Sequence, residues 1–114
     1  MKITRIDCIP VSLPFAKPMI MSGGAVTAAH SVLLKLHTDE GVTGIAETGD
    51  TSLWYMGESQ DSILYNLTKV YAPILLGEDP FNIETIIAKM DKAARANNHS
   101  KAVVDYALHD LMGK

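Results

Sequence analysis

The side chains with the greatest capacity for chemistry in this sequence are four histidines and one cysteine. Zinc and similar metals are held by His and Cys ligands at close, regular spacings. None of the histidines has a partner at HxH or HxxxH spacing or a cysteine beside it, and each falls in a different predicted element. We therefore predict no metal site in this segment. The residues concerned are His30, His37, His99, His109 and Cys8.

Asp105 and His109 are the pair best suited to acid–base catalysis, because a carboxylate one helical turn away can orient an imidazole. A structural contact on the helix surface explains the same spacing and is the more common outcome. Cys8 lies in an extended segment without a nearby histidine in sequence, and we interpret it as a small core residue. No catalytic residue is therefore predicted in this segment.

Three extended segments must position whatever site the chain carries. Residues 2–13 are rich in Ile and Val, and residues 31–38 and 42–48 return with alternating apolar and polar side chains, which predicts strands. Asp39-Glu40-Gly41 predicts a three-residue hairpin loop, in which the glycine can take the left-handed conformation without steric cost. These patterns predict a three-stranded antiparallel sheet.

Prolines and loop composition point to two binding segments. Pro10 cannot donate to a ladder, which favours an edge position for the first strand, and Pro14 and Pro18 are expected to end it. The connection 15–29 is then long for a meander, and the segment 49–57 holds the only tryptophan beside a tyrosine. Long ordered loops often serve as lids or binding loops, so both are predicted to contact a ligand or another domain.

The second half of the sequence has helical period and predicts three helices. Pro73 is expected to end or kink the first of them at the preceding residue. Gly77 suits a left-handed cap, and Asp79-Pro80 suits the N-cap and first position of the next helix. The predicted helices cover about residues 59–72, 80–96 and 100–112.

The third predicted helix is apolar around most of its circumference. Only Lys101, Asp105 and His109 form a narrow polar ridge, with Asp110 beside it. A helix of this kind is normally buried on several sides. Because a small domain offers little to bury it against, we expect a structure beyond residue 114 to cover it.

Length and charge restrict the class of protein. A chain of 114 residues is long enough for one domain, and its net charge of −3 argues against nucleic acid as the partner. No apolar run approaches the roughly 20 residues of a membrane span. The single cysteine excludes an internal disulfide and suits the cytoplasm, where we expect the protein to reside.

Several motifs together resemble the N-terminal domain of the mandelate racemase and muconate-lactonizing enzymes of the enolase superfamily. The hairpin region is similar to the family pattern T-D-x-G-x-x-G-x-[GA]-E, and the start of the first helix to Y-x-G-E-[ST]. The end of the chain follows K-A-A-[IVL]-D-x-A-L-[WH]-D-L-x-G-K most closely, with His109 where many members have Trp. The matching segments are 1–14, 22–24, 38–47, 55–59, 77–80 and 101–114.

The resemblance implies an α+β capping domain for an enzyme whose (β/α)₈ barrel begins after Lys114. Members of this family abstract a proton alpha to a carboxylate, and barrel residues hold Mg²⁺ and supply the acid and base. The implied reaction is racemisation or epimerisation, cycloisomerisation or dehydration of a small carboxylate substrate. The implied partners are the chain's own barrel domain and further copies of the protein, with no nucleic acid or membrane.

The resemblance gives the two predicted binding segments a role: both fold over the substrate, exclude water and set specificity. Two alternatives remain: a freestanding α+β module that binds a small molecule or dimerises, with the third helix buried in a homodimer, and a small enzyme that uses Asp105 and His109. The predicted substrate-contacting residues are Met19, Ile20 and Ser22 in the first segment and Asp50, Thr51, Trp54 and Tyr55 in the second.

Overall fold

The computed structural model describes residues 1–21, 24–48 and 57–114 and shows a three-stranded antiparallel sheet followed by helices. This confirms the predicted fold class. The strands are β1 (Ile3–Met21), β2 (Gly24–Thr38) and β3 (Thr43–Glu47), in the order β1-β2-β3. The helical segments are α2 (Gln60–Tyr65), the π-helix η1 (Asn66–Tyr71), α3 (Ala72–Leu75), α4 (Ile83–Ala93) and α5 (Asn98–Gly113).

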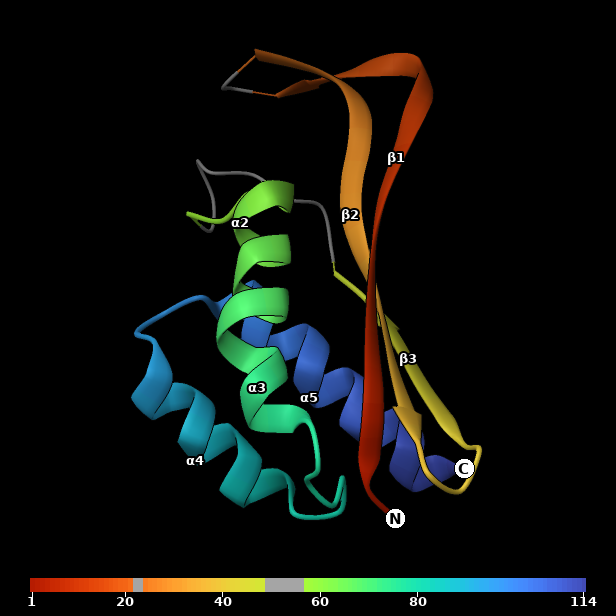
Figure 1. Ribbon diagram of the computed structural model, residues 1–114. Coiled ribbons are helices and arrows are strands. Elements are labelled where there is room, and N and C mark those ends of the chain that lie inside the picture. Colours follow the sequence, from red (N-terminus) through yellow and green to blue (C-terminus); the bar gives the residue numbers. More distant parts are fainter. Residues whose placement is uncertain (22–23, 49–56) are drawn as a thin grey trace.

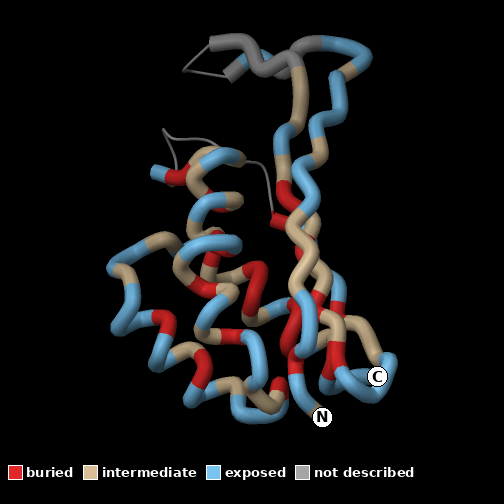
Figure 2. The backbone as a smooth tube through the Cα atoms, viewed as in Figure 1, coloured by how far each residue is buried: buried red, intermediate tan, exposed pale blue. Residues whose placement is uncertain are grey.

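One face of the sheet carries the core. Val32, Leu34 and Leu36 alternate along β2 and are completely buried, as the period of two predicts. The helical body α2–η1–α3 lies against β1 and β2, whereas α5 crosses β3 and β2 and α4 packs on the outside of the other helices (Figure 1). Figure 2 shows that the buried residues concentrate where the sheet meets the helices. The core is therefore a single two-layer packing.

The first strand is much longer than predicted. Pro14 does not end β1, because β1 is an edge strand and its register against β2 shifts between Pro14 and Met19. An edge strand with an irregularity tolerates prolines, which cannot donate ladder hydrogen bonds. The predicted long loop 15–29 is therefore wrong: its described residues belong to a β1–β2 hairpin.

The first helical body continues to Leu75, past the predicted end at residue 72, and its regular α-helix is interrupted just before Pro73, where an end or a kink was expected. Pro73 lies in α3 directly after the π-helix η1, where the Ala72 N–H bonds to the Leu67 carbonyl five residues back. Proline lacks an N–H and disturbs the regular α ladder, and the wider turn comes immediately before it. Ile63, Leu67, Tyr71 and Leu75 form the predicted buried stripe.

The next helix begins three residues later than predicted. The Asp79 Oδ1 atom accepts a hydrogen bond from the Phe81 N–H at 2.9 Å, and the Asn82 N–H bonds the Asp79 carbonyl at 3.0 Å. Asp79 therefore closes a turn that contains Pro80, and α4 starts at Ile83. The left-handed conformation expected for Gly77 is present, with a φ of +85°.

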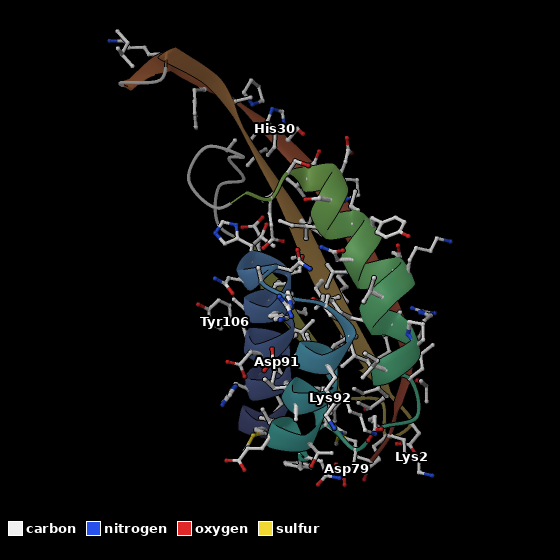
Figure 3. The ribbon with its side chains drawn as sticks, turned by 90° about the vertical axis from the view of Figure 1, so that its left-hand side faces the viewer. Lys2, His30, Asp79, Asp91, Lys92 and Tyr106 are labelled. Atoms are coloured by element: carbon white, nitrogen blue, oxygen red, sulfur yellow. The ribbon has the colours of Figure 1, made fainter. Side chains whose placement is uncertain are left out.

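The domain itself covers most of the apolar surface of α5. The residues that pack inward occur at the helical spacing expected of one face. They are Val103, Val104, Ala107, Leu108 and Leu111, each at most 1% exposed. The expectation that a structure beyond residue 114 must cover this helix is therefore wrong for these residues. Tyr106 and Met112 do remain exposed, and Figure 3 shows Tyr106 pointing away from the domain.

Candidate functional site

The part of the molecule best placed to contact something else is the β1–β2 hairpin, which projects beyond the helical layer (Figure 1). The ladder continues through Val11↔Ser31 and Pro14↔Ala28 and ends with Ile20↔Ala25 and Met21↔Gly24. Figure 3 shows His30 on β2 just beyond the start of α2, where the hairpin leaves the helices. Among the described residues, no helix packs against the far part of this projecting arm.

The hairpin exposes apolar side chains. Ile20 is 87% exposed, the highest value of any large apolar side chain in the described residues, and Leu13 is 60% exposed. A two-stranded hairpin without a core of its own is only marginally stable in water. Exposed apolar groups on such an arm are best explained by a second surface that the arm contacts.

The base of the hairpin is fixed by hydrogen bonds to the residues that flank segment 49–56. The Thr48 N–H donates to the Val32 carbonyl at 3.0 Å, and the Val32 N–H donates to the Thr48 Oγ1 atom at 2.9 Å. On the returning side, the Gln60 Nε2 atom donates to the carbonyls of Val11 at 3.1 Å and Ser31 at 2.9 Å. The chain thus leaves and re-enters the described core beside the hairpin.

Glu58 has a structural task in this region. It is 2% exposed, and its carboxylate accepts hydrogen bonds from the His99 N–H at 2.7 Å, the Ser100 N–H at 3.2 Å and the Ser100 hydroxyl at 2.6 Å. These N–H groups lie in the first turn of α5, where backbone donors lack partners and the helix dipole favours a negative charge. Glu58 therefore ties the start of α2 to the start of α5.

The motif at the end of the chain joins α5 to β3. The Asp110 Oδ2 atom accepts from the Ile45 N–H at 2.9 Å and lies 2.8 Å from Lys114 Nζ, which also donates to the Thr43 carbonyl at 2.9 Å. The hydrogen bond from Lys114, with the one from Ile45, lowers the pKa of Asp110 below its usual 3.8. These contacts fasten the end of α5 to β3.

A second polar group lies on the face of the sheet away from the helices. His37 Nε2 lies 2.7 Å from Asp7 Oδ2, and Arg5 lies 3.3 Å from the same oxygen. The hydrogen bond to His37 is the main cause of a lowered pKa for Asp7.

On the opposite face of the sheet, burial raises the pKa of the half-buried Cys8 thiol to about 11, which leaves little thiolate at neutral pH. Cys8 packs against the core, as predicted.

The remaining candidate groups do not assemble into a reactive centre in the described residues. His109 Nδ1 lies 3.2 Å from Asp105 Oδ1 and 2.9 Å from the Asp105 carbonyl oxygen, and both side chains are exposed. Across 1–21, 24–48 and 57–114, no group of three or more His, Cys, Asp or Glu residues could hold a metal ion. No helix in that same part of the chain is long and apolar enough to cross a membrane.

The predicted substrate-contacting residues fall partly within the described structure. Met19 and Ile20 lie in β1 near the end of the hairpin, paired with Val26 and Ala25. Glu58 and Gln60 were missed as residues that hold this region together. The signal in the sequence was the glutamate of the Y-x-G-E-[ST] pattern, which marks only the start of the first helix in the sequence analysis. Ser22, Asp50, Thr51, Trp54 and Tyr55 lie outside the described residues.

Solved structures with the same fold are larger enzymes. An N-succinyl Arg/Lys racemase from Bacillus cereus superposes with a TM-score of 0.93 at 35% identity, covering 99% of this chain and 30% of the racemase. A dipeptide epimerase from Enterococcus faecalis, solved with Mg and the dipeptide L-Leu-L-Tyr, gives a TM-score of 0.92 at 29% identity, covering 99% and 31%. The fold is thus that of an N-terminal capping domain of the enolase type.

Sequence comparison gives the family. The model of the mandelate racemase / muconate lactonizing enzyme N-terminal domain matches residues 3–114. The chain is 37% identical over 114 residues to the N-succinyl-L-Arg/Lys racemase of Bacillus cereus, all of this chain and 31% of that enzyme. It is 35% identical to the cis-3-hydroxy-L-proline dehydratase of Roseibium aggregatum, again 100% of this chain and 31% of that one. The chain belongs to the mandelate racemase / muconate lactonizing enzyme family and spans about a third of the length of these relatives.

Proposed function

We propose that this chain is the substrate-capping and specificity domain of a Mg²⁺-dependent enzyme that abstracts a proton alpha to a carboxylate. The observation that carries the proposal is the β1–β2 hairpin, which projects beyond the core with Ile20 87% exposed. In the whole enzyme this arm covers the substrate. The overall reaction is a racemisation or epimerisation, a cycloisomerisation or a dehydration.

The relatives support this reaction class. Their names include a racemase, a dehydratase and, at 35% identity, a chloromuconate cycloisomerase of Cupriavidus necator. Racemisation requires that a bond to hydrogen at a stereocentre be broken and remade, which is general acid–base chemistry. The alternative of a freestanding binding module is less well supported, because these relatives carry a domain of this kind as about a third of a larger enzyme.

The described residues form no site that could hold Mg²⁺. They contain no cluster of carboxylates or histidines able to hold Mg²⁺. We therefore assign Mg²⁺ and the acid and base residues to a barrel domain after Lys114. Such a metal ion would stabilise negative charge on the substrate carboxylate. The partners that we propose are this barrel, a small carboxylate substrate and further copies of the enzyme in the cytoplasm.

The proposed role of this chain is to cover the active site and to select the substrate. A cap that displaces water strengthens the electrostatic interactions beneath it and protects reactive intermediates. Apolar side chains at the hairpin would favour a substrate with an apolar portion. The residues that we propose for substrate contact are Met19, Ile20, Ser22, Asp50, Thr51, Trp54 and Tyr55.

The test uses the full-length enzyme. Solvent deuterium exchange into N-acylated amino acids, proline derivatives, dipeptides and muconates, with and without Mg²⁺, identifies the reaction. On the best substrate, Ile20→Ser should raise KM about tenfold or more, since roughly 1.5–3 kcal/mol accompanies full burial of such a side chain. Leu76→Ser is the control, because Leu76 is 47% exposed and precedes Gly77, whose N–H bonds the Ile3 carbonyl at the opposite end of β1.

Two results would count against the proposal. If none of these substrates shows deuterium exchange that depends on Mg²⁺, the proposed chemistry is refuted. Equal kinetic parameters for Ile20→Ser, Leu76→Ser and the unchanged enzyme would refute the proposed capping role of the hairpin.

A further inference from the structure

One side chain of the helical layer bonds both strands of the projecting hairpin. Gln60 is the first residue of α2, and its Nε2 atom donates to the Val11 carbonyl at 3.1 Å and the Ser31 carbonyl at 2.9 Å. A primary amide has two N–H donors on one nitrogen, so both are used here, one on each strand. Val11 and Ser31 are also cross-strand partners in the ladder.

The position of this contact along the sheet is informative. The last ladder pair between β2 and β3 is Leu33↔Glu47, and Val32 still bonds Thr48 directly after it. Beyond Val32, β1 is the only strand paired with β2 in the described residues. Val11 and Ser31 therefore mark the place where the three-stranded sheet becomes a two-stranded arm. Strand pairs without a third strand twist and bend more easily than a sheet. A fixed contact at this place sets the direction in which the arm leaves the core.

The backbone that carries Gln60 is itself held firmly. Ser59 is the N-cap of α2 and forms a reciprocal capping box with Ser62, with distances of 3.1 Å and 2.8 Å. The preceding residue, Glu58, binds the first turn of α5 through its buried carboxylate. Gln60 thus belongs to a capped helix start that Glu58 also ties to α5.

We infer that Gln60 is a positioning residue that sets the orientation of the β1–β2 hairpin over the substrate. The inference rests on the proposed function, because only a hairpin that covers the substrate makes its orientation matter for binding. Gln60 does not touch the reacting atoms in this scheme. Its effect passes through Val11 and Ser31 to the arm that carries Ile20.

The test compares three variants of the full-length enzyme. Gln60→Met keeps the length of the side chain and removes both donors, whereas Gln60→Glu keeps the shape and places a carboxylate against two carbonyl oxygens. Thr68→Val is the matched control, since the Thr68 hydroxyl on the same helical body bonds only carbonyls of its own helix, those of Leu64 and Tyr65. The readouts are KM, kcat and amide hydrogen exchange of residues 11–14 and 28–31.

The expected result is a split between the two kinetic constants. The loss of two hydrogen bonds should raise KM about tenfold in Gln60→Met, with kcat within about threefold, because the contact aids binding and not the chemical step. Gln60→Glu should raise KM further, and amide exchange at the hairpin base should quicken in both variants. Thr68→Val should leave all of these values unchanged.

The outcomes separate this inference from the proposed function. If Ile20→Ser raises KM and the Gln60 variants do not, the hairpin caps the substrate but Gln60 does not position it. If the Gln60 variants quicken amide exchange without any change in KM, the contact is only structural and the inference is overturned. If neither Ile20→Ser nor Gln60→Met changes KM in an active enzyme, the capping role itself fails.

Discussion

Replacing Gly44 with alanine should destabilise the fold strongly, because α5 crosses β3 directly over this residue. A Cβ atom at Gly44 would lie 2.4 Å from the Ala107 carbonyl oxygen and 2.6 Å from Leu111 Cγ. Real Cβ contacts do not fall below 3.0 Å, so the helix would have to move by at least 0.6 Å. Asp110 and Lys114 hold the helix to β3 with hydrogen bonds of 2.9 Å, which resist this movement.

The size of the effect follows from these contacts. Overpacking in a tight core costs about 1–3 kcal/mol. Weakening the hydrogen bond between Ile45 and Asp110 adds roughly 1 kcal/mol. A strand glycine changed to alanine regains about 0.5–1 kcal/mol of backbone entropy. The net loss in the free energy of unfolding should be about 1–3.5 kcal/mol, or roughly 4–15 °C in Tm for a domain of this size.

The assay is urea unfolding followed by far-ultraviolet circular dichroism, with two other glycine-to-alanine variants for comparison. Gly113→Ala should be nearly neutral, because no atom lies within 4 Å of its Cβ position. Gly77→Ala should lose roughly 1–2 kcal/mol through left-handed strain alone, since its φ is +85° and its Cβ would meet open space. A Gly44→Ala variant as stable as Gly113→Ala would refute the close helix–strand contact as the reason for this glycine.

Three further predictions concern stability and reactivity. Asp110→Asn should lower the Tm of the protein at pH 7. Because the pKa of Asp110 is lowered from 3.8 in the folded state, the difference in Tm between the variant and the unchanged protein should shrink as pH falls below about 3.8, which a series of Tm measurements against pH would show. The Cys8 thiol, with its pKa raised from 9.0 to about 11 by burial, should react with iodoacetamide at pH 7 about 100-fold more slowly than the unfolded chain, and equal rates would contradict this. Glu58→Ala should lower the free energy of unfolding by about 2–4 kcal/mol, because two N–H groups and a buried hydroxyl lose their acceptor. Glu58→Gln should lower it by less, and the denaturant midpoints of the two variants measure the difference.

The order of strands and helices was predictable because each segment has one clear period. The alternation of Val32, Leu34 and Leu36 and the i, i+4 stripe from Ile63 to Leu75 each correspond to one buried face. The turn at Asp39-Glu40-Gly41 was also predictable, because few residues other than glycine accept the φ of +77° found at Gly41. These are local preferences, and the global packing agrees with them.

The errors arose where a residue had two possible local roles. Prolines at 14 and 18 can end a strand or lie in an irregular edge strand, and only the position of β1 at the sheet edge decides between these. Asp79 can cap a helix or close a turn, and the Phe81 N–H lies in reach of its carboxylate in the turn. Sequence period alone contains no information on such choices.

The residues that organise the candidate site could not be found from spacing, because their partners are far away along the chain. Glu58 bonds residues 41 and 42 positions later, and Gln60 bonds carbonyls 49 and 29 positions earlier. Each contact joins two elements whose relative placement exists only after the core has formed. Three adjacent residues at the start of α2 have three different partners. Glu58 accepts hydrogen bonds from the first turn of α5, Ser59 caps α2, and Gln60 donates to both strands of the hairpin. A motif that reads as an ordinary helix start is therefore also the joint between the core and its projecting arm.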